Sequence, residues 1–207
     1  MIDQIICGDC LEVLSNIEDD SVDCIITDPP YGINKGKIIG DESLDVWRQS
    51  LMGSYRVLKP DTFYCVFASV EKLPEVICDA TKFFDYRWTT IFYIKNGRTR
   101  GGVGFSNYYP CLIFMKGKAT IKSQMNDICV GAMTNHQKYR THPYQKDIKF
   151  MNRLVTTFSK EGDLILDPFS GSGTSGVAAK RNDRHYICIE KEPEYCAIAE
   201  KRIAEML

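Results

Sequence analysis

Apolar positions along the chain form short continuous runs that alternate with stretches of helical periodicity. Runs rich in β-branched and aromatic residues predict strands at 22–27, 63–69, 87–95, 111–116, 163–167 and 185–190. Apolar residues at helical spacing predict helices at 11–17, 43–58, 72–84, 147–159, 177–182 and 192–207. Near-continuous apolar strands separated by helices indicate an α/β fold with a mainly parallel sheet covered on both faces.

Two segments, 32–42 and 117–145, interrupt this pattern because neither has a clear apolar period. Loops of this length inside a compact domain usually carry function or are mobile. A chain of 207 residues, 44% of them hydrophobic, is long enough for one sizeable core and short for two. We therefore expect one domain that comprises residues 1–207.

The formal net charge of −1 is unevenly distributed. The segment from Lys95 to Arg153 carries eleven basic and two acidic residues, which leaves 15 basic and 25 acidic residues elsewhere. A lysine-rich solvated surface explains this imbalance as well as a binding surface does. Aromatic residues lie among these cations, however, and that combination suits a polyanion with exposed bases. We therefore predict nucleic acid as the partner, bound by Arg98, Arg100, Lys118, Lys122, Lys138 and Arg140.

Nine cysteines, an odd number, lie mostly in apolar runs, where a reduced thiol packs as a small hydrophobe. This usage favours a reducing compartment. The chain shows no basic leader and no uncharged apolar stretch of membrane-spanning length, so we expect a cytoplasmic protein without a membrane partner. Cys7 and Cys10 have the spacing of a metal-binding or redox pair, but no second pair follows, so we expect packing and no metal site.

A rigid segment follows the first predicted strand, where Thr27 leads into Asp28-Pro29-Pro30-Tyr31. Proline fixes its own φ and pushes the preceding residue into extended conformations, so this segment has little backbone freedom. It presents a hydrogen-bond acceptor, Asp28, and an aromatic ring, Tyr31. An ordinary Asp-Pro turn with a core tyrosine is the alternative interpretation.

A glycine-rich turn joins the strand at 163–167 to the helix at 177–182, with Gly171, Gly173 and Gly176 in a G-x-G-x-x-G pattern. There backbone can approach a ligand closely and helix N–H groups can face negative charge. Glu190 ends the next predicted strand, where a carboxylate can accept hydrogen bonds from two ribose hydroxyls. The unit predicts a nucleoside-cofactor site, although the same turn could serve helix–strand packing alone. A Walker A loop is excluded because no Gly-Lys-Ser/Thr follows.

The position of this turn is unusual, because a dinucleotide dehydrogenase normally begins with it, whereas here only 31 residues follow Gly176. The two motifs, Asp28–Tyr31 and Asp167–Thr174, together resemble those of the beta-group DNA amino-methyltransferases, in which D-P-P-Y precedes the target-recognition segment and D-P-F-x-G-S-G-T comes last. The resemblance implies a three-layer, Rossmann-like fold of the S-adenosylmethionine-dependent methyltransferases, with a circularly permuted motif order. It also implies a short target-recognition insert near 117–141.

Shorter segments extend the resemblance. Gly8–Leu14 is similar to the family segment that contacts the cofactor adenine, and His142–Lys146 is similar to the one that meets the methionine end. The family more often has Gly at the position of Thr62 and His-Glu near Tyr109-Pro110, which affects one edge of the substrate cleft. The cofactor residues implied for S-adenosylmethionine are Asp9, Cys10, Lys146, Asp167, Pro168, Phe169, Ser170, Gly171, Gly173, Thr174 and Glu190.

The D-P-P-Y residues suit catalysis on an exocyclic amine, whose lone pair is delocalised into the base. Asp28 and the main-chain carbonyl of Pro29 can accept its two N–H groups and so aim the lone pair at a methyl donor. Tyr31 can stack on a base rotated out of double-stranded DNA. The predicted catalytic set is Asp28, Pro29, Pro30 and Tyr31.

Methyl transfer to N6 of adenine is the predicted reaction, because the cytosine-N4 enzymes that this chain resembles more often have Ser in place of Asp28. Cytosine N4 remains an alternative. A nicotinamide-dependent oxidoreductase with the same glycine loop, and an inert nucleic-acid-binding protein with the same fold, are further alternatives. The resemblance leaves open whether the protein forms a homodimer and whether a cognate restriction enzyme accompanies it.

Overall fold

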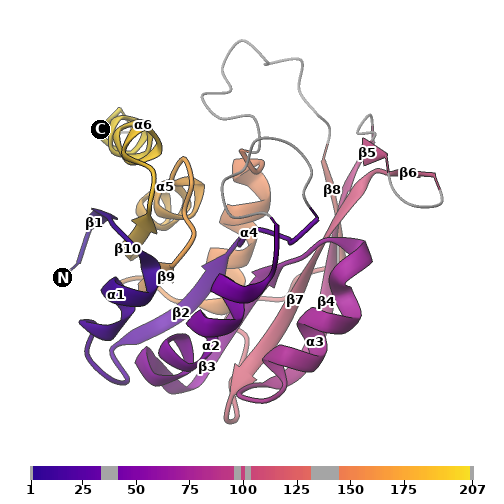
Figure 1. The fold of residues 1–207 in the computed structure, drawn as a ribbon, viewed down its shortest axis with the longest axis horizontal. Helices are drawn as coiled ribbons and strands as arrows, with labels where there is room; N and C mark the ends of the chain where they lie inside the picture. The colour runs from indigo at the N-terminus through magenta and orange to yellow at the C-terminus, as the bar shows by residue number, and fades with distance from the viewer. Residues whose placement is uncertain (1, 34–41, 96–98, 101–103, 132–144, 206–207) are drawn as a thin grey trace.

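The computed structural model describes residues 2–33, 42–95, 99–100, 104–131 and 145–205, and its main feature is an eight-stranded sheet (Figure 1). Across the sheet the strands follow the order β1 (Gln4–Cys7), β10 (His185–Glu190), β9 (Leu164–Asp167), β2 (Val22–Thr27), β3 (Leu58–Phe67), β7 (Tyr108–Lys116), β4 (Asp85–Ile94) and β8 (Ile128–Gly131). A separate two-stranded ribbon pairs β5 (Thr99–Arg100) with β6 (Phe105–Ser106).

Helices cover both faces of the sheet. One face packs against α1 (Cys10–Ser15), α2 (Asp45–Val57) and α3 (Leu73–Ala80), which follows the 3₁₀ turn η1 (Val70–Lys72). The other face packs against α4 (Ile148–Phe158), α5 (Thr174–Arg181) and α6 (Pro193–Ala204). The central strand β2 supplies both cores, since Ile25 faces the first helix layer while Cys24 and Ile26 face the second. The predicted α/β fold with three layers is confirmed.

The sheet is mainly parallel, as predicted, and only β7 runs antiparallel to its neighbours β3 and β4. All six predicted strands are present, whereas β1, β5, β6 and β8 were not predicted. The predicted strand at 63–69 is longer, because β3 begins at Leu58 and includes Pro60. Pro60 is tolerated because the register with β2 shifts between Leu58 and Phe63, a bulge where no ladder N–H is required.

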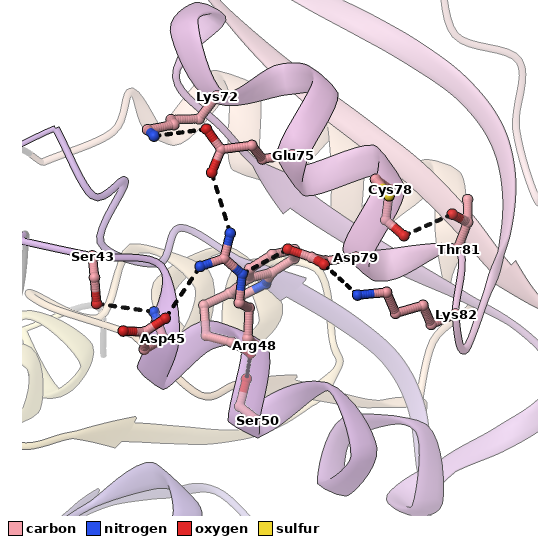
Figure 2. Close-up of polar contacts among 11 residues, drawn as sticks. Ser43, Asp45, Arg48, Ser50, Lys72, Glu75, Cys78, Asp79, Thr81 and Lys82 are labelled. Carbon is pink, nitrogen blue, oxygen red and sulfur yellow. Dashed lines mark hydrogen bonds and ion pairs between the residues drawn. The ribbon is translucent and has the colours of Figure 1, made fainter.

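Ion pairs fix α2 against α3 (Figure 2). The Arg48 guanidinium lies 2.6 Å from a carboxylate oxygen of Asp79, 3.2 Å from one of Glu75 and 3.1 Å from one of Asp45. Burial of Asp79 opposes ionisation, but hydrogen bonds from Lys82 and Arg48 outweigh it and lower the pKa of this carboxyl below 3.8. The helix that follows the D-P-P-Y segment is thereby fixed to its neighbour.

Strands from opposite ends of the chain meet at the centre of the sheet. β9 pairs in parallel with β2, with Cys24 opposite Ile165 and Ile25 opposite Leu166. The chain leaves β2 toward the face that holds α2 but leaves β9 toward the face that holds α5 (Figure 1). Neighbouring parallel strands whose connections diverge in this way create a crevice at their carboxyl ends, which is where α/β proteins bind ligands. In the described part of the chain, no helix has the length and apolar character needed to cross a membrane.

Candidate active site

The two sequence motifs lie at this crevice, one after each strand. Asp28 directly follows β2, and Asp167 is the last residue of β9. The hydroxyl of Thr27 donates a 2.7 Å hydrogen bond to Oδ1 of Asp167, so the residue before the D-P-P-Y motif is bonded to the first residue of the glycine loop. Residues 140 positions apart in the sequence are thus brought together by strand pairing.

The Asp28 carboxylate, 21% exposed, has a partner on each oxygen. The Tyr31 hydroxyl donates to Oδ1, and Nζ of Lys146 lies 2.7 Å from Oδ2. Burial, followed by the charge of Asp28 and the hydrogen bond to it, raises the pKa of the Tyr31 phenol well above 10, so this hydroxyl stays protonated and donates. Pro29 is buried and Pro30 half-buried, and Gly32 follows at φ +66°. A Cβ at Gly32 would lie 2.9 Å from the Ser43 main chain, so only glycine fits this turn.

Three aromatic rings surround the Lys146 ammonium. The ring centroids of Tyr109, Phe67 and Tyr31 lie 4.8, 5.1 and 5.4 Å from Nζ. Phe67 ends β3, and Tyr109 lies near the start of the antiparallel β7, so the pairing of these two strands brings both rings to the carboxyl end of β2. No sequence pattern pointed to Phe67, because a buried aromatic in an apolar run is typical of a core position.

Asp167 is 2% exposed and fully hydrogen-bonded within the protein. Besides Thr27, it accepts from the Ser175 hydroxyl at 2.6 Å and from the Phe169 amide at 3.1 Å. Burial outweighs these donors and raises its pKa to about 6. The carboxylate was predicted to contact a cofactor, but the structure uses it to bond the glycine loop to β2 and α5.

The glycine loop is held open by bonds to its flanks. The Gly171 amide donates 2.8 Å to Glu190, whose other carboxylate oxygen accepts from the Glu192 amide at 2.9 Å. Gly171 has φ +52°, and a Cβ built there meets nothing within 4 Å, so its outer side is open. Gly173 has φ +73°, and a Cβ there would lie 2.7 Å from Cβ of Ala199 on α6. Gly171 therefore leaves room beside the loop, whereas Gly173 allows close helix packing.

The remaining loop residues and the N-terminal segment surround this opening. Pro168, Ser170 and Thr174 are buried, and Phe169 packs partly against the first core. Asp9 caps α1 by accepting from the Leu11 amide at 2.9 Å, next to the end of β10. Cys10 is buried, and burial raises the pKa of its thiol to about 12, so it packs as a neutral side chain. The structure thus brings Asp9, the glycine loop and Glu190 to one edge of the sheet.

Arg202 of α6 supports the same loop and was not predicted. Its guanidinium donates to the main-chain carbonyl and the hydroxyl of Ser172 and, at 3.2 Å, to the Thr174 hydroxyl. Burial, with a smaller contribution from Arg181, lowers its pKa to about 10. A single arginine on an amphipathic helix is typical of a solvated surface, so no sequence pattern could have identified it.

The predicted DNA contacts are only partly described. Arg98, Lys138 and Arg140 lie outside the described residues, as does part of the insert predicted near 117–141, and of Arg100 only the backbone is described, in β5. The backbone amides of Lys118 and Lys122 bond to Asp61 and Thr157, beside the start of β3 and the end of α4. Because Thr62 pairs with Lys116 while Phe67 pairs with Cys111, this is the sheet edge opposite Asp28. The structure does not bring these two lysines to the catalytic motif.

Comparison with known proteins identifies the class. The profile of the DNA methylase family named for N6 and N4 methylation matches residues 22–201. The chain is 30% identical to the type II methyltransferase M.HpaI of Haemophilus parainfluenzae, over 98% of this chain and 74% of that protein. It is 27% identical to the DNA adenine methyltransferase YhdJ of Escherichia coli K12, over 96% of this chain and 82% of that protein.

Solved structures agree in fold. The DNA modification methylase TTHA0409 of Thermus thermophilus, complexed with S-adenosylmethionine, has a TM-score of 0.79 at 22% identity and covers 98% of this chain and 93% of its own. The cytosine-N4-specific PvuII DNA methyltransferase has a TM-score of 0.81 at 20% identity, covering 98% and 86%. The chain belongs to the N6/N4 DNA methylase family and is a DNA methyltransferase that uses S-adenosylmethionine.

Proposed function

We propose that this protein methylates N6 of adenine in DNA. The observation that carries the proposal is the bond between Thr27 and Asp167, which joins an amine-binding acceptor segment to an open glycine loop. A methyl transferase must hold two ligands in contact, and catalysis of this kind depends chiefly on positioning. The name of the E. coli relative and the presence of Asp rather than Ser at position 28 favour adenine.

The residues around the glycine loop fit S-adenosylmethionine. The side of Gly171 without a Cβ gives room for main-chain contact, and the buried Ser170 hydroxyl has no hydrogen-bond partner. Both carboxylate oxygens of Glu190 accept one amide each, and a carboxylate oxygen can accept a further hydrogen bond, as a ribose hydroxyl requires. Asp9, Glu190 and residues 168–174 are the proposed binding set. When bound, this cofactor supplies a methyl group activated by a sulfonium.

The chain's own groups prepare the target amine. Asp28 accepts one N–H of the exocyclic amine, and the Pro29 carbonyl accepts the other, which directs the nitrogen lone pair toward the cofactor side of the crevice. Tyr31 offers its ring to the base, which must leave the DNA stack to reach this depth. Pro29 and Pro30 limit the backbone freedom of the acceptors. No covalent bond between protein and base is required.

Label transfer tests the activity directly. Purified protein is incubated with methyl-labelled S-adenosylmethionine and DNA, and the DNA is digested to nucleosides that are identified by mass spectrometry. N6-methyladenine is the expected product, and Asp28→Ala should lower its formation by about 100-fold or more while the cofactor Kd changes little. Dominant N4-methylcytosine would reject adenine but keep the methyltransferase, and unlabelled DNA would reject the function.

N4 of cytosine is the second candidate, supported by the N4 branch of the family and by the fold of the PvuII enzyme. Both bases present an exocyclic amine beside a ring nitrogen, so the acceptors alone do not separate them. A single catalytic domain with an insert near 117–141 that reads the DNA sequence, a homodimer and a cognate restriction enzyme remain predictions. Sequencing host DNA for modified bases would identify both the base and its recognition site.

A further inference from the structure

Lys146 occupies a constructed site rather than a surface position. It immediately precedes α4, yet its side chain is only 10% exposed. Its ammonium lies 2.7 Å from Oδ2 of Asp28 and donates to the Tyr31 hydroxyl at 3.0 Å. The resemblance had implied that Lys146 contacts the methionine end of the cofactor, whereas here its polar contacts are with the D-P-P-Y segment.

The surroundings of the ammonium explain why it stays there. A buried cation is stable only when it is paired, and the carboxylate of Asp28 pairs it. The rings of Tyr31, Phe67 and Tyr109 add cation–π attraction from three different segments of the chain. An ion pair in such a poorly solvated place is held more rigidly than one in water.

The backbone of Lys146 is fixed as well. The Asp147 side chain caps α4 by accepting from the Lys149 amide at 2.8 Å. Phe150 in the first turn packs against Phe92 of β4, with ring centroids 4.5 Å apart. The start of α4 is therefore attached to the sheet, and Lys146 extends from a fixed point toward Asp28.

We propose that Lys146 is a positioning residue for methyl transfer, whose ammonium holds the Asp28 carboxylate in the orientation that receives the target amine. The inference rests on the proposed function of Asp28. Each carboxylate oxygen accepts about two hydrogen bonds, so Asp28 retains capacity for an amine N–H while Lys146 and Tyr31 stay bound. Lys146 acts through Asp28 and need not touch the substrate.

The test separates this role from cofactor binding. Lys146→Met keeps the length of the side chain and removes its charge, Lys146→Arg keeps the charge, and Lys149→Met is the matched control because Lys149 is exposed three residues away. For each variant, the Kd of S-adenosylmethionine is measured by calorimetry, and the single-turnover rate is measured at saturating cofactor on DNA containing the identified site.

We expect Lys146→Met to lower the single-turnover rate by about 10- to 100-fold, with a change of less than about 3-fold in cofactor Kd. Lys146→Arg should recover part of the rate, and Lys149→Met should change neither quantity. A weaker cofactor Kd with a normal rate at saturation would overturn the proposal in favour of a cofactor contact. An unchanged rate and Kd, or an arginine variant no faster than the methionine variant, would also overturn it.

A second measurement does not depend on turnover. In a thermal double-mutant cycle of Lys146→Met and Asp28→Asn, the loss of Tm from Lys146→Met should largely disappear when Asp28 is already neutral. Additive losses would contradict the pairing even if Lys146→Met were too unstable for kinetics. Wild-type protein that transfers no label would instead reject the proposed function, so the two failures are distinguishable.

Discussion

Thr27 and Asp167 are joined by a buried 2.7 Å hydrogen bond that links the acceptor segment to the glycine loop. Thr27 is 0% exposed and Asp167 is 2% exposed, so water does not compete for the bond. Asp167 also bonds to Ser175 in the first turn of α5. One carboxylate therefore sets the distance between the two halves of the site.

Replacing Thr27 with Val tests this link, because the substitution keeps the shape and removes the donor. We expect a loss of about 1–3 kcal/mol in the free energy of unfolding, since a buried carboxylate loses a donor. Turnover should fall by about 10- to 100-fold through misplacement of Asp28 relative to the loop. Chemical denaturation and single-turnover assays measure the two effects.

Thr90→Val is the matched control. Thr90 is also 0% exposed, and its hydroxyl donates 3.0 Å to the Asp127 carbonyl beside β8, away from the catalytic crevice. It should lose similar stability without losing turnover beyond the folded fraction. Equal activity losses in the two variants would show that the Thr27 effect is only a packing effect.

Tyr31 variants separate the ring from the hydroxyl. Tyr31→Ala removes the stacking surface and one ring beside Lys146, so methylation should fall by about 10-fold or more. Tyr31→Phe removes only the hydrogen bond to Asp28, which Lys146 still holds, so a loss of a few-fold is expected. Steady-state kinetics on one DNA substrate measure both. A phenylalanine variant as impaired as the alanine variant would assign the main role to the hydroxyl.

The pH dependence of stability reports on Asp167. Its pKa is about 6 in the folded chain, against an ordinary value of 3.8, so between these values the native state holds a proton that the unfolded chain has lost. The contribution of this group to stability is therefore present below pH 3.8 and decreases as pH rises to 6, by about 3 kcal/mol at most. Measured as the difference in unfolding free energy between wild type and Asp167→Asn, the wild-type advantage should shrink across this range.

Asp79→Asn is the control of opposite sign for that experiment. Hydrogen bonds from Lys82 and Arg48 outweigh burial and lower the pKa of Asp79, so its contribution is present above pH 3.8 and is lost only as pH falls further. The difference between wild type and Asp79→Asn should stay flat between about pH 4 and 6. A flat difference for Asp167→Asn as well would mean that its carboxyl titrates normally.

The basic segment makes a prediction about DNA affinity. If Arg98 and Arg100 contact phosphates, replacing both with Ala should reduce the slope of log affinity against log salt by up to about two units. Thermal stability should change little. Replacing Lys118 and Lys122, which lie at the opposite edge of the sheet, should leave the slope unchanged. Fluorescence anisotropy over a salt series measures all the slopes, and equal slopes for wild type and the arginine variant would contradict phosphate contact.

Local patterns in the sequence determined the layers of the fold and the position of both motifs. Apolar runs identified the six core strands, because burial on both faces of a sheet requires nearly continuous apolar residues. The same patterns missed β1 and β8, which are four-residue strands at the two edges of the sheet, where exposed positions interrupt the apolar run. Proline and glycine identified the acceptor segment and the loop, since both residue types constrain backbone directly.

Only the tertiary structure decided which distant residues share the site. Sequence patterns report the periodicity of one element, whereas the contacts of Thr27 with Asp167, of Lys146 with Asp28 and of Arg202 with Ser172 arise where separate elements pack together. The pairing of β2 with β9 made the first contact, and the docking of α4 on the sheet made the second. The roles of Asp167 and Lys146 therefore depend on packing that no local pattern contains, because hydrogen bonds and ion pairs follow distance in space and not distance along the chain.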